Sequence, residues 1–335
     1  MPMRDAPLPR MAGDLTFMRS RRASVESLHA DNLAILGAPI EDNIGRKAGT
    51  RFAPTAIRET SVYFGWHANP QFSHPVDIDK RSAIDTSAMH GRLVDVGDIP
   101  LEGLEAQSAV FAIRSLTRRI AEQNASTIVL GGDDSIVEPA IDGAIDKGSV
   151  GFIQIGGRLP GHSSLFERAS GAEPVGHDAP PLARLLSDGR VEARNVMVMV
   201  SPSRPGIEFV RDFQQAGGVL LNAAAVAEAR AEDITKNACT LARSTRSLHV
   251  QFDASAFRPS LHGMSERPAF GGLTLPDVQK VLGAIGQAPV SSLMVTGLNP
   301  TLSGLSVVKT GLRLTVTALL SYIYGRLGLT TIQAE

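Results

Sequence analysis

The sequence predicts one α/β domain, a three-layer α/β/α sandwich built on a doubly wound, mainly parallel sheet of about eight strands. Short apolar runs recur along the 335 residues, and most of them end in glycine or aspartate. Longer segments between these runs space their apolar residues as helices do. No linker-like change of composition interrupts the alternation, so we expect a single domain over residues 31–330.

Composition excludes several classes of function. The net charge of -1 argues against binding to nucleic acid or to a membrane surface, since both favour an excess of Lys and Arg. No apolar run approaches the ~20 residues that cross a bilayer. The single cysteine, Cys239, forms no internal disulfide and reads as a small buried residue, which indicates a cytoplasmic protein.

The first third of the chain contains an arm, a strand and a helix start. Residues 1–30 hold several prolines and scattered basic residues, which predict an arm that is flexible or docks on a neighbour rather than core. An apolar strand follows at residues 33–37. Pro54 suits the first turn of the next helix. Residues 65–92 lack periodicity and predict a long loop, functional or interfacial, before a short strand at residues 93–98.

The central stretch runs from Ile128 to Ser135 and follows an amphipathic helix at residues 105–123. Its apolar residues predict a buried strand, and two glycines then deliver Asp133 and Asp134 at the strand's carboxyl end. Ligands bind at this edge in open α/β sheets. Adjacent carboxylates indicate a metal site or an acid/base pair, and the alternative is that one of them merely caps the next helix.

The remaining elements continue the alternation. A helix is expected near residues 137–146, another is opened by residues 271–277, and the last covers residues 309–327. Further strands are predicted at residues 150–155, 195–200, 218–221, 247–253 and 290–295.

Several short motifs occur in an order that resembles one family. They are Gly37-Ala38-Pro39, the G-x-R-x-A-P-x-x-I-R run from Gly49 to Arg58, Asp95-Val96-Gly97-Asp98, Leu130-Gly131-Gly132-Asp133, Gly271-Gly272-Leu273-Thr274 and Asn299-Pro300. Over residues 33–327 the chain resembles the ureohydrolases, which include arginases, agmatinases and guanidinobutyrases. The resemblance implies an arginase-like fold and a centre of two manganese or nickel ions whose bridging water attacks a guanidinium carbon and releases urea.

The family's metal ligands lie in three motifs, GGDHS, DAHxD and SFDxDxxDP, and this chain departs from all three. At the ligand positions it carries Asp134, Gly156, Arg158, Pro160, Asp253 and Ser255. Only Asp253 keeps the family residue, although Asp134 is still able to coordinate a metal. The family's substrate-facing glutamate falls at Ala269, and a further carboxylate falls at Gly297. We therefore expect no catalytic residues and no metal in this chain.

Arg158 carries most weight in this interpretation. A guanidinium is charged at working pH and repels a metal ion placed next to it. The Arg158 guanidinium is suited instead to pair with Asp133, Asp134 or Asp253. We interpret these carboxylates as remnants of a metal site. His162 aligns with a loop histidine of the family and is read either as an exposed loop residue or as a further member of this residual polar cluster.

The pattern of losses resembles the non-catalytic subunit of heteromeric guanidine hydrolases. It implies a partner, an active ureohydrolase paralogue holding nickel or manganese, in a trimeric or hexameric assembly. The arm at residues 1–30 and the loop at residues 65–92 are the expected contacts between chains. The alternatives are an active amidino hydrolase with an altered or single-metal centre, and a small-molecule sensor that retains the cleft.

Overall fold

The computed structural model describes most of the chain. The described residues are 14–41, 48–64, 76–77, 82–100, 106–144, 149–160, 179–200, 204–265, 267, 271–329 and 331–333.

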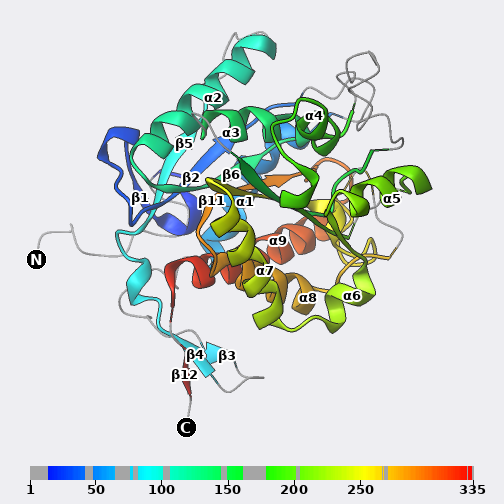
Figure 1. Ribbon diagram of the computed structural model, residues 1–335. Helices are drawn as coiled ribbons and strands as arrows, with labels where there is room; N and C mark the ends of the chain where they lie inside the picture. The colour runs from blue at the N-terminus through cyan, green and yellow to red at the C-terminus, as the bar shows by residue number, and fades with distance from the viewer. Residues whose placement is uncertain are drawn as a thin grey trace, which may run out of the picture.

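A parallel sheet of nine strands forms the centre of the molecule (Figure 1). In spatial order the strands are β1 (Arg21–Arg22), β5 (Leu93–Asp98), β2 (Leu33–Ala38), β6 (Ser126–Gly131), β11 (Val290–Thr296), β10 (Ser247–Asp253), β7 (Val150–Ile155), β8 (Val196–Met199) and β9 (Val219–Leu221). Every neighbouring pair in this sheet is parallel. The predicted doubly wound sheet is thus confirmed, with β1 added at one edge.

Helices cover both faces of the sheet, which gives the predicted three layers. One face carries α1 (Ala53–Ser61), α6 (Ala223–Glu228), α7 (Ala231–Ser244), α8 (Leu275–Gly286) and α9 (Leu305–Leu327). The other carries α2 (Ala106–Glu122), α3 (Val137–Gly143), α4 (Pro181–Ser187) and α5 (Ile207–Gln215). Within the described residues no helix is both long and apolar enough to cross a membrane.

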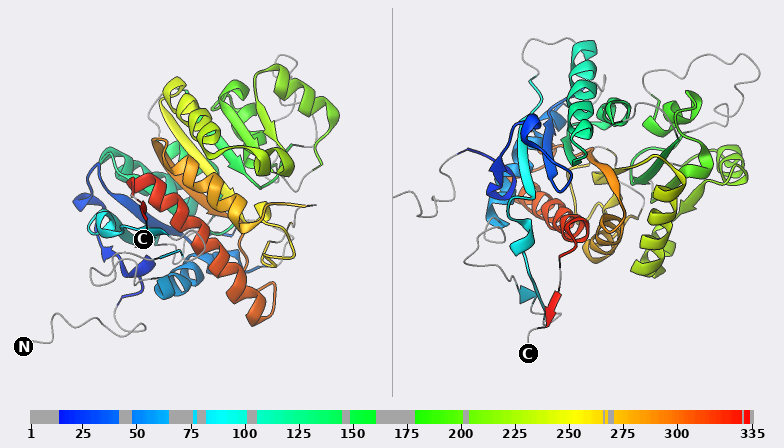
Figure 2. Two further views of the ribbon diagram at one scale, coloured as in Figure 1. Left: turned by 90° about the horizontal axis from the view of Figure 1, so that it is seen from below. Right: turned by 60° about the vertical axis from the view of Figure 1, so that its left-hand side comes forward.

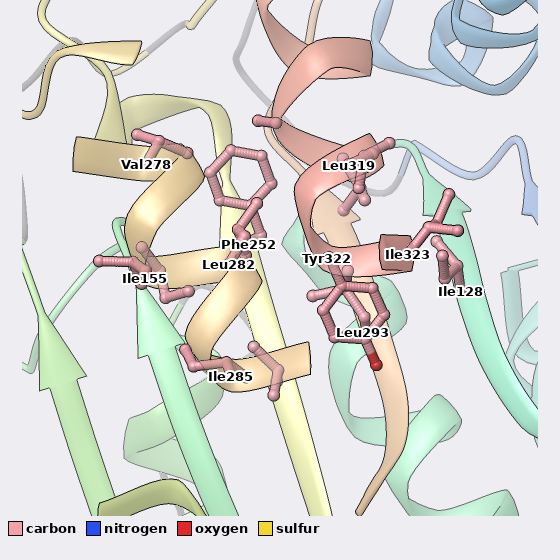
Figure 3. Packing of buried hydrophobic residues seen from close by; sticks show 14 of the residues in the cluster. Ile128, Ile155, Phe252, Val278, Leu282, Ile285, Leu293, Leu319, Tyr322 and Ile323 are labelled. Carbon is pink, nitrogen blue, oxygen red and sulfur yellow. The ribbon is translucent and has the colours of Figure 1, made fainter. Parts of the chain in front are cut away.

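The larger apolar core lies between the sheet and the pair α8 and α9 (Figure 3). Strand residues such as Ile155, Phe252 and Leu293 face helix residues such as Leu282 and Leu319, and all are buried. The two helices lie side by side (Figure 2). Their approach depends on glycines, because a Cβ at Gly286 would lie 2.4 Å from the Tyr322 carbonyl oxygen. The centre of the sheet is therefore packed tightly against α8 and α9.

The N-terminal segment differs from the arm predicted over residues 1–30. Residues 1–13 lie outside the described residues, but residues 14–30 belong to the domain. Phe17 and Met18 are completely buried, and their backbone N–H groups donate to the Asp95 carboxylate (2.7 Å) and to the Ser61 hydroxyl (2.8 Å). These bonds join positions far apart in the sequence, so the local pattern of prolines and basic residues could not predict them.

Parts of the long loop at residues 65–92 have structure of their own. β3 (Val76–Asp77) and β4 (Ser82–Ile84) form an antiparallel sheet with β12 (Thr331–Gln333), apart from the main sheet (Figure 1). A short 3-10 turn follows at Ser87–Met89. The role of this loop in contacts between chains stays a prediction.

Candidate functional site

The carboxyl ends of β6, β7, β10 and β11 lead into turns that surround one pocket. Its open space is about 360 Å³, and it is lined by Thr50, Asp133, Asp134, Gly157, Arg158, Asp253, Ser255, Ser265, Arg267 and Gly297. Parallel strands bring their carboxyl ends to one edge, which explains how motifs more than a hundred residues apart meet here.

The turn after β6 separates the roles of the two adjacent aspartates. The Asp133 carboxylate accepts from the Ser135 backbone N–H at 3.0 Å and from the Ser135 hydroxyl, so it caps the 3-10 turn Asp134–Ile136. A Cβ at Gly132 would lie 1.8 Å from the Ile40 carbonyl oxygen, so only glycine fits there. Capping therefore describes Asp133, and Asp134 is the carboxylate that points to a partner across the pocket.

That partner is Arg158. Its Nε and Nη2 donate to the same oxygen of Asp134, at 3.0 and 2.9 Å, and the two side chains are only 15% and 11% exposed. Gly156 and Gly157, with φ of 76° and 73°, turn the chain after β7, and Gln154 donates to the Arg158 carbonyl oxygen at 3.0 Å. The backbone thus places the Arg158 guanidinium in the position that the family resemblance assigns to a metal ligand.

Asp253 is satisfied by neighbours of its own chain. Its carboxylate accepts from the Ser255 backbone N–H (2.9 Å), the Ser255 hydroxyl (2.6 Å) and the Thr296 hydroxyl (2.7 Å). Burial raises the pKa of Asp253, and the nearby charge of Asp134 acts in the same direction. A Cβ at Gly297 would lie 2.5 Å from the Asp253 carboxylate, so the carboxylate that the family has at this position does not fit unless Asp253 moves.

The donor set of this pocket does not fit a two-metal cluster. Two dications require several carboxylates and histidines, whereas the pocket lining includes two guanidiniums, one of them paired with Asp134. Among the described residues, no group of three or more His, Cys, Asp or Glu side chains is arranged to hold a metal ion.

The structure brings together most of the residues that the sequence singled out. Asp133, Asp134, Arg158, Asp253 and Ser255 line the pocket. Gly156 lies beside the Ala256 backbone, and Pro160 is buried; neither residue lines the pocket. His162 and Ala269 lie outside the described residues.

Three pocket-lining residues and one residue that supports the pocket were missed by the sequence analysis. Thr296 supports Asp253, while Thr50, Ser265 and Arg267 line the cavity. Thr50 lies inside a recognised motif, where its hydroxyl donates to Glu41 at 3.2 Å. Ser265 and Arg267 belong to a loop with no periodicity, so only their position just before the Gly271-Gly272 motif could have indicated them.

A second arginine–carboxylate group lies at the same edge of the sheet, built from motifs that the chain retains. Arg58 donates from Nε and Nη2 to the two oxygens of Asp95, at 2.8 and 3.0 Å, and from Nη1 to Asp98. Burial alone would lower the pKa of Arg58, but its bonds to Asp95 and Asp98 outweigh that effect and raise it. This group anchors α1 and the N-terminal segment to β5.

Comparison with known proteins places the chain among relatives that hydrolyse guanidino and amidino compounds. It is 26% identical over 177 residues to a mitochondrial guanidino acid hydrolase of Homo sapiens, which covers 52% of this chain and 44% of that protein. It is 23% identical over 297 residues to proclavaminate amidinohydrolase of Streptomyces clavuligerus, covering 87% of each. For the first of these relatives the chain matches less than half of the protein's length.

Solved structures show the same fold. The formimidoylglutamase of Bacillus subtilis superposes with a TM-score of 0.71 at 17% identity, covering 98% of this chain and 96% of that one. Each motif discussed above lies within the region, residues 31–320, that matches the model of the arginase family. That match spans most of the sequence, and the chain belongs to the arginase family.

Proposed function

We propose that this chain is a catalytically inactive subunit that assembles with an active, metal-dependent paralogue of the same family and supports it. The observation that carries the proposal is the ion pair between Arg158 and Asp134. Both residues stand at positions where the family places metal ligands, and they neutralise each other there. A chain that lacks metal ligands can still contribute if its surface binds and supports a neighbouring chain. Such a role would explain why the fold is retained.

The pattern of losses also resembles one heteromeric enzyme, metformin hydrolase, in which one of two related subunits lacks the metal ligands. By that resemblance the paralogue would hold nickel or manganese and hydrolyse a guanidine or biguanide compound to urea and an amine. The complex would be a cytoplasmic trimer or hexamer. In this proposal the described residues of this chain have a structural role and bind no metal, so no chemical step is assigned to them.

Metal analysis of the purified chain is the first test. Inductively coupled plasma mass spectrometry after dialysis against nickel and manganese should find far less than one tightly bound ion per chain. About two ions per chain would overturn the proposal and favour an active hydrolase. An intact family member, treated in the same way, is the positive control.

Co-expression with a paralogue that keeps GGDHS, DAHxD and DxD is the second test. Amidino hydrolase activity and a mixed oligomer should appear only when both chains are present. Replacing a metal-binding carboxylate of the paralogue should abolish the activity, whereas Asp253→Asn in this chain should leave it within about twofold, which corresponds to less than about 0.5 kcal/mol. Activity of this chain alone, or its loss from the complex with Asp253→Asn, would favour the alternative of an altered catalytic centre. Ligand binding without assembly would favour a sensor.

A further inference from the structure

Each carboxylate of the pocket accepts hydrogen bonds from donors of its own chain through at least one oxygen. Asp133 caps its turn through Ser135, Asp134 accepts from Arg158, and Asp253 accepts from Ser255 and Thr296. A cationic ligand would have to compete with these bonds, which are short and largely shielded from water. Formal charge alone, three carboxylates against two guanidiniums, would favour a cation, but the geometry of the acceptors opposes it.

Two further donors in the lining are Arg267 and Ser265. Arg267 lines the pocket and is half-exposed, and the ion pairs among the described residues account for Arg158 but do not include Arg267. Ser265 lies next to it, and its hydroxyl oxygen accepts from the Arg267 backbone N–H at 3.2 Å. The Ser265 hydroxyl proton is then available to a ligand. A planar guanidinium and a neighbouring hydroxyl are the donors that carboxylates bind best.

We propose that this pocket binds a small carboxylate through the Arg267 guanidinium and the Ser265 hydroxyl, in the space that a guanidinium substrate and metal ions fill in the resemblance described above. Its open space of about 360 Å³ includes solvent at the mouth, so the enclosed part suits only a short-chain acid. The proposal does not depend on assembly with a paralogue, because every group it uses belongs to one chain.

Binding of two matched probes to the purified full-length chain tests this inference. Sodium butyrate and n-butylammonium chloride have similar size and opposite charge, and ligand-observed NMR titration to about 10 mM covers the affinity expected of so small a molecule. We expect saturable binding of butyrate and at least tenfold weaker binding of n-butylammonium.

Substitutions locate the bound anion. Arg267→Gln should weaken butyrate binding about tenfold or more, Arg267→Lys should retain part of it, and Ser265→Ala should have a smaller effect. Arg194→Gln, which changes an exposed arginine paired with Glu192 outside the pocket, is the matched control and should leave the affinity unchanged. Thermal unfolding of each variant verifies that it folds.

Three results would overturn the inference. They are equal or tighter binding of n-butylammonium, butyrate binding that Arg267→Gln leaves intact in a folded protein, and no saturable binding of butyrate to the wild-type chain. These outcomes are distinct from failure of the proposed function, which is measured by metal content and by activity in the presence of the paralogue.

Discussion

Two arginine–carboxylate groups at one edge of the sheet differ in what surrounds them. Within the Arg58 group, the Arg58–Asp95 pair is almost inaccessible: its side chains are 4% and 0% exposed, and both oxygens of Asp95 accept from the guanidinium. The Arg158 pair borders a pocket, and the hydrogen bonds from Nε and Nη2 both end on one oxygen of Asp134. The same chemistry therefore anchors the fold in one region and lines the candidate site in the other.

The comparison shows why one group lies in retained motifs and the other in altered ones. Asp95 also accepts from the backbone N–H groups of Phe17 and Gly97, so a change there would leave several buried donors unpaired. Asp134 accepts two hydrogen bonds from Arg158 at the pocket. Such a pair can replace other residues at the pocket without disturbing the sheet below it.

The largest expected effect is on folding, from Arg58→Ala. Removing this guanidinium leaves Asp95 as a buried uncompensated charge and should cost about 3–5 kcal/mol of unfolding free energy. Urea denaturation followed by circular dichroism measures the loss. Arg58→Lys, which keeps the charge but not the paired geometry, should lose less. A cost no larger than that of Arg158→Ala would refute the distinction between the two groups.

Acid should weaken the protein through two buried histidines. Burial lowers the pKa of His249, on the same strand as Asp253, to about 4, and does the same to His262. Their folded pKa lies below the unfolded value of 6.5, so each contributes stability that is complete above pH ~6.5 and is lost as pH falls toward 4. The loss should reach about 3 kcal/mol for each histidine.

Urea unfolding at pH 7.5, 6 and 4.5 measures this dependence. Burial raises the pKa of Asp253, so its contribution has the opposite sign and is lost as pH rises through the folded pKa. His262→Asn should make the unfolding free energy depend less on pH between pH 6.5 and 4. An unchanged dependence in that variant would exclude His262 as a cause of the loss of stability in acid.

A smaller effect is expected from the Arg158–Asp134 pair, measured as a coupling energy. A double-mutant cycle with Arg158→Met and Asp134→Asn should give about 1–2 kcal/mol, because the pair is mostly shielded from water. The exposed pair Arg118–Glu122, whose side chains are 56% and 55% exposed, is the control and should couple by less than about 0.5 kcal/mol. Equal coupling in the two pairs would mean that the pocket gives Arg158 no special environment.

The smallest effect should follow Asp253→Asn. An amide oxygen can accept the Ser255 bonds, its NH₂ group can donate to the Thr296 hydroxyl, and no guanidinium depends on this carboxylate in the bonds described above. We expect a change within about 1 kcal/mol by urea denaturation. Asp95→Asn is the matched comparison and should cost clearly more, since Arg58 then loses a charged partner.

The central strands were predictable because each is buried on both faces. Such strands appear as continuous apolar runs, as at residues 33–38, 126–131 and 150–155. β1 has only two residues, Arg21 and Arg22, both exposed, so no pattern marks it. Helices α4 to α7 also had no assigned counterpart, and the core position of Phe17 and Met18 depends on a carboxylate on β5.

Within the candidate site, the sequence identified which residues meet and which chemistry had changed, because motifs at the ends of parallel strands converge on one edge. The sequence did not decide which of three aspartates pairs with Arg158. Only the three-dimensional arrangement showed that Arg158 pairs with Asp134, that Asp133 caps a turn, and that Asp253 accepts from Ser255 and Thr296. It also brought Arg267 into the lining of the same pocket. Residue type and order determine the sheet and the loss of ligands, whereas the pairing of charges depends on distances of a few ångströms that only packing sets.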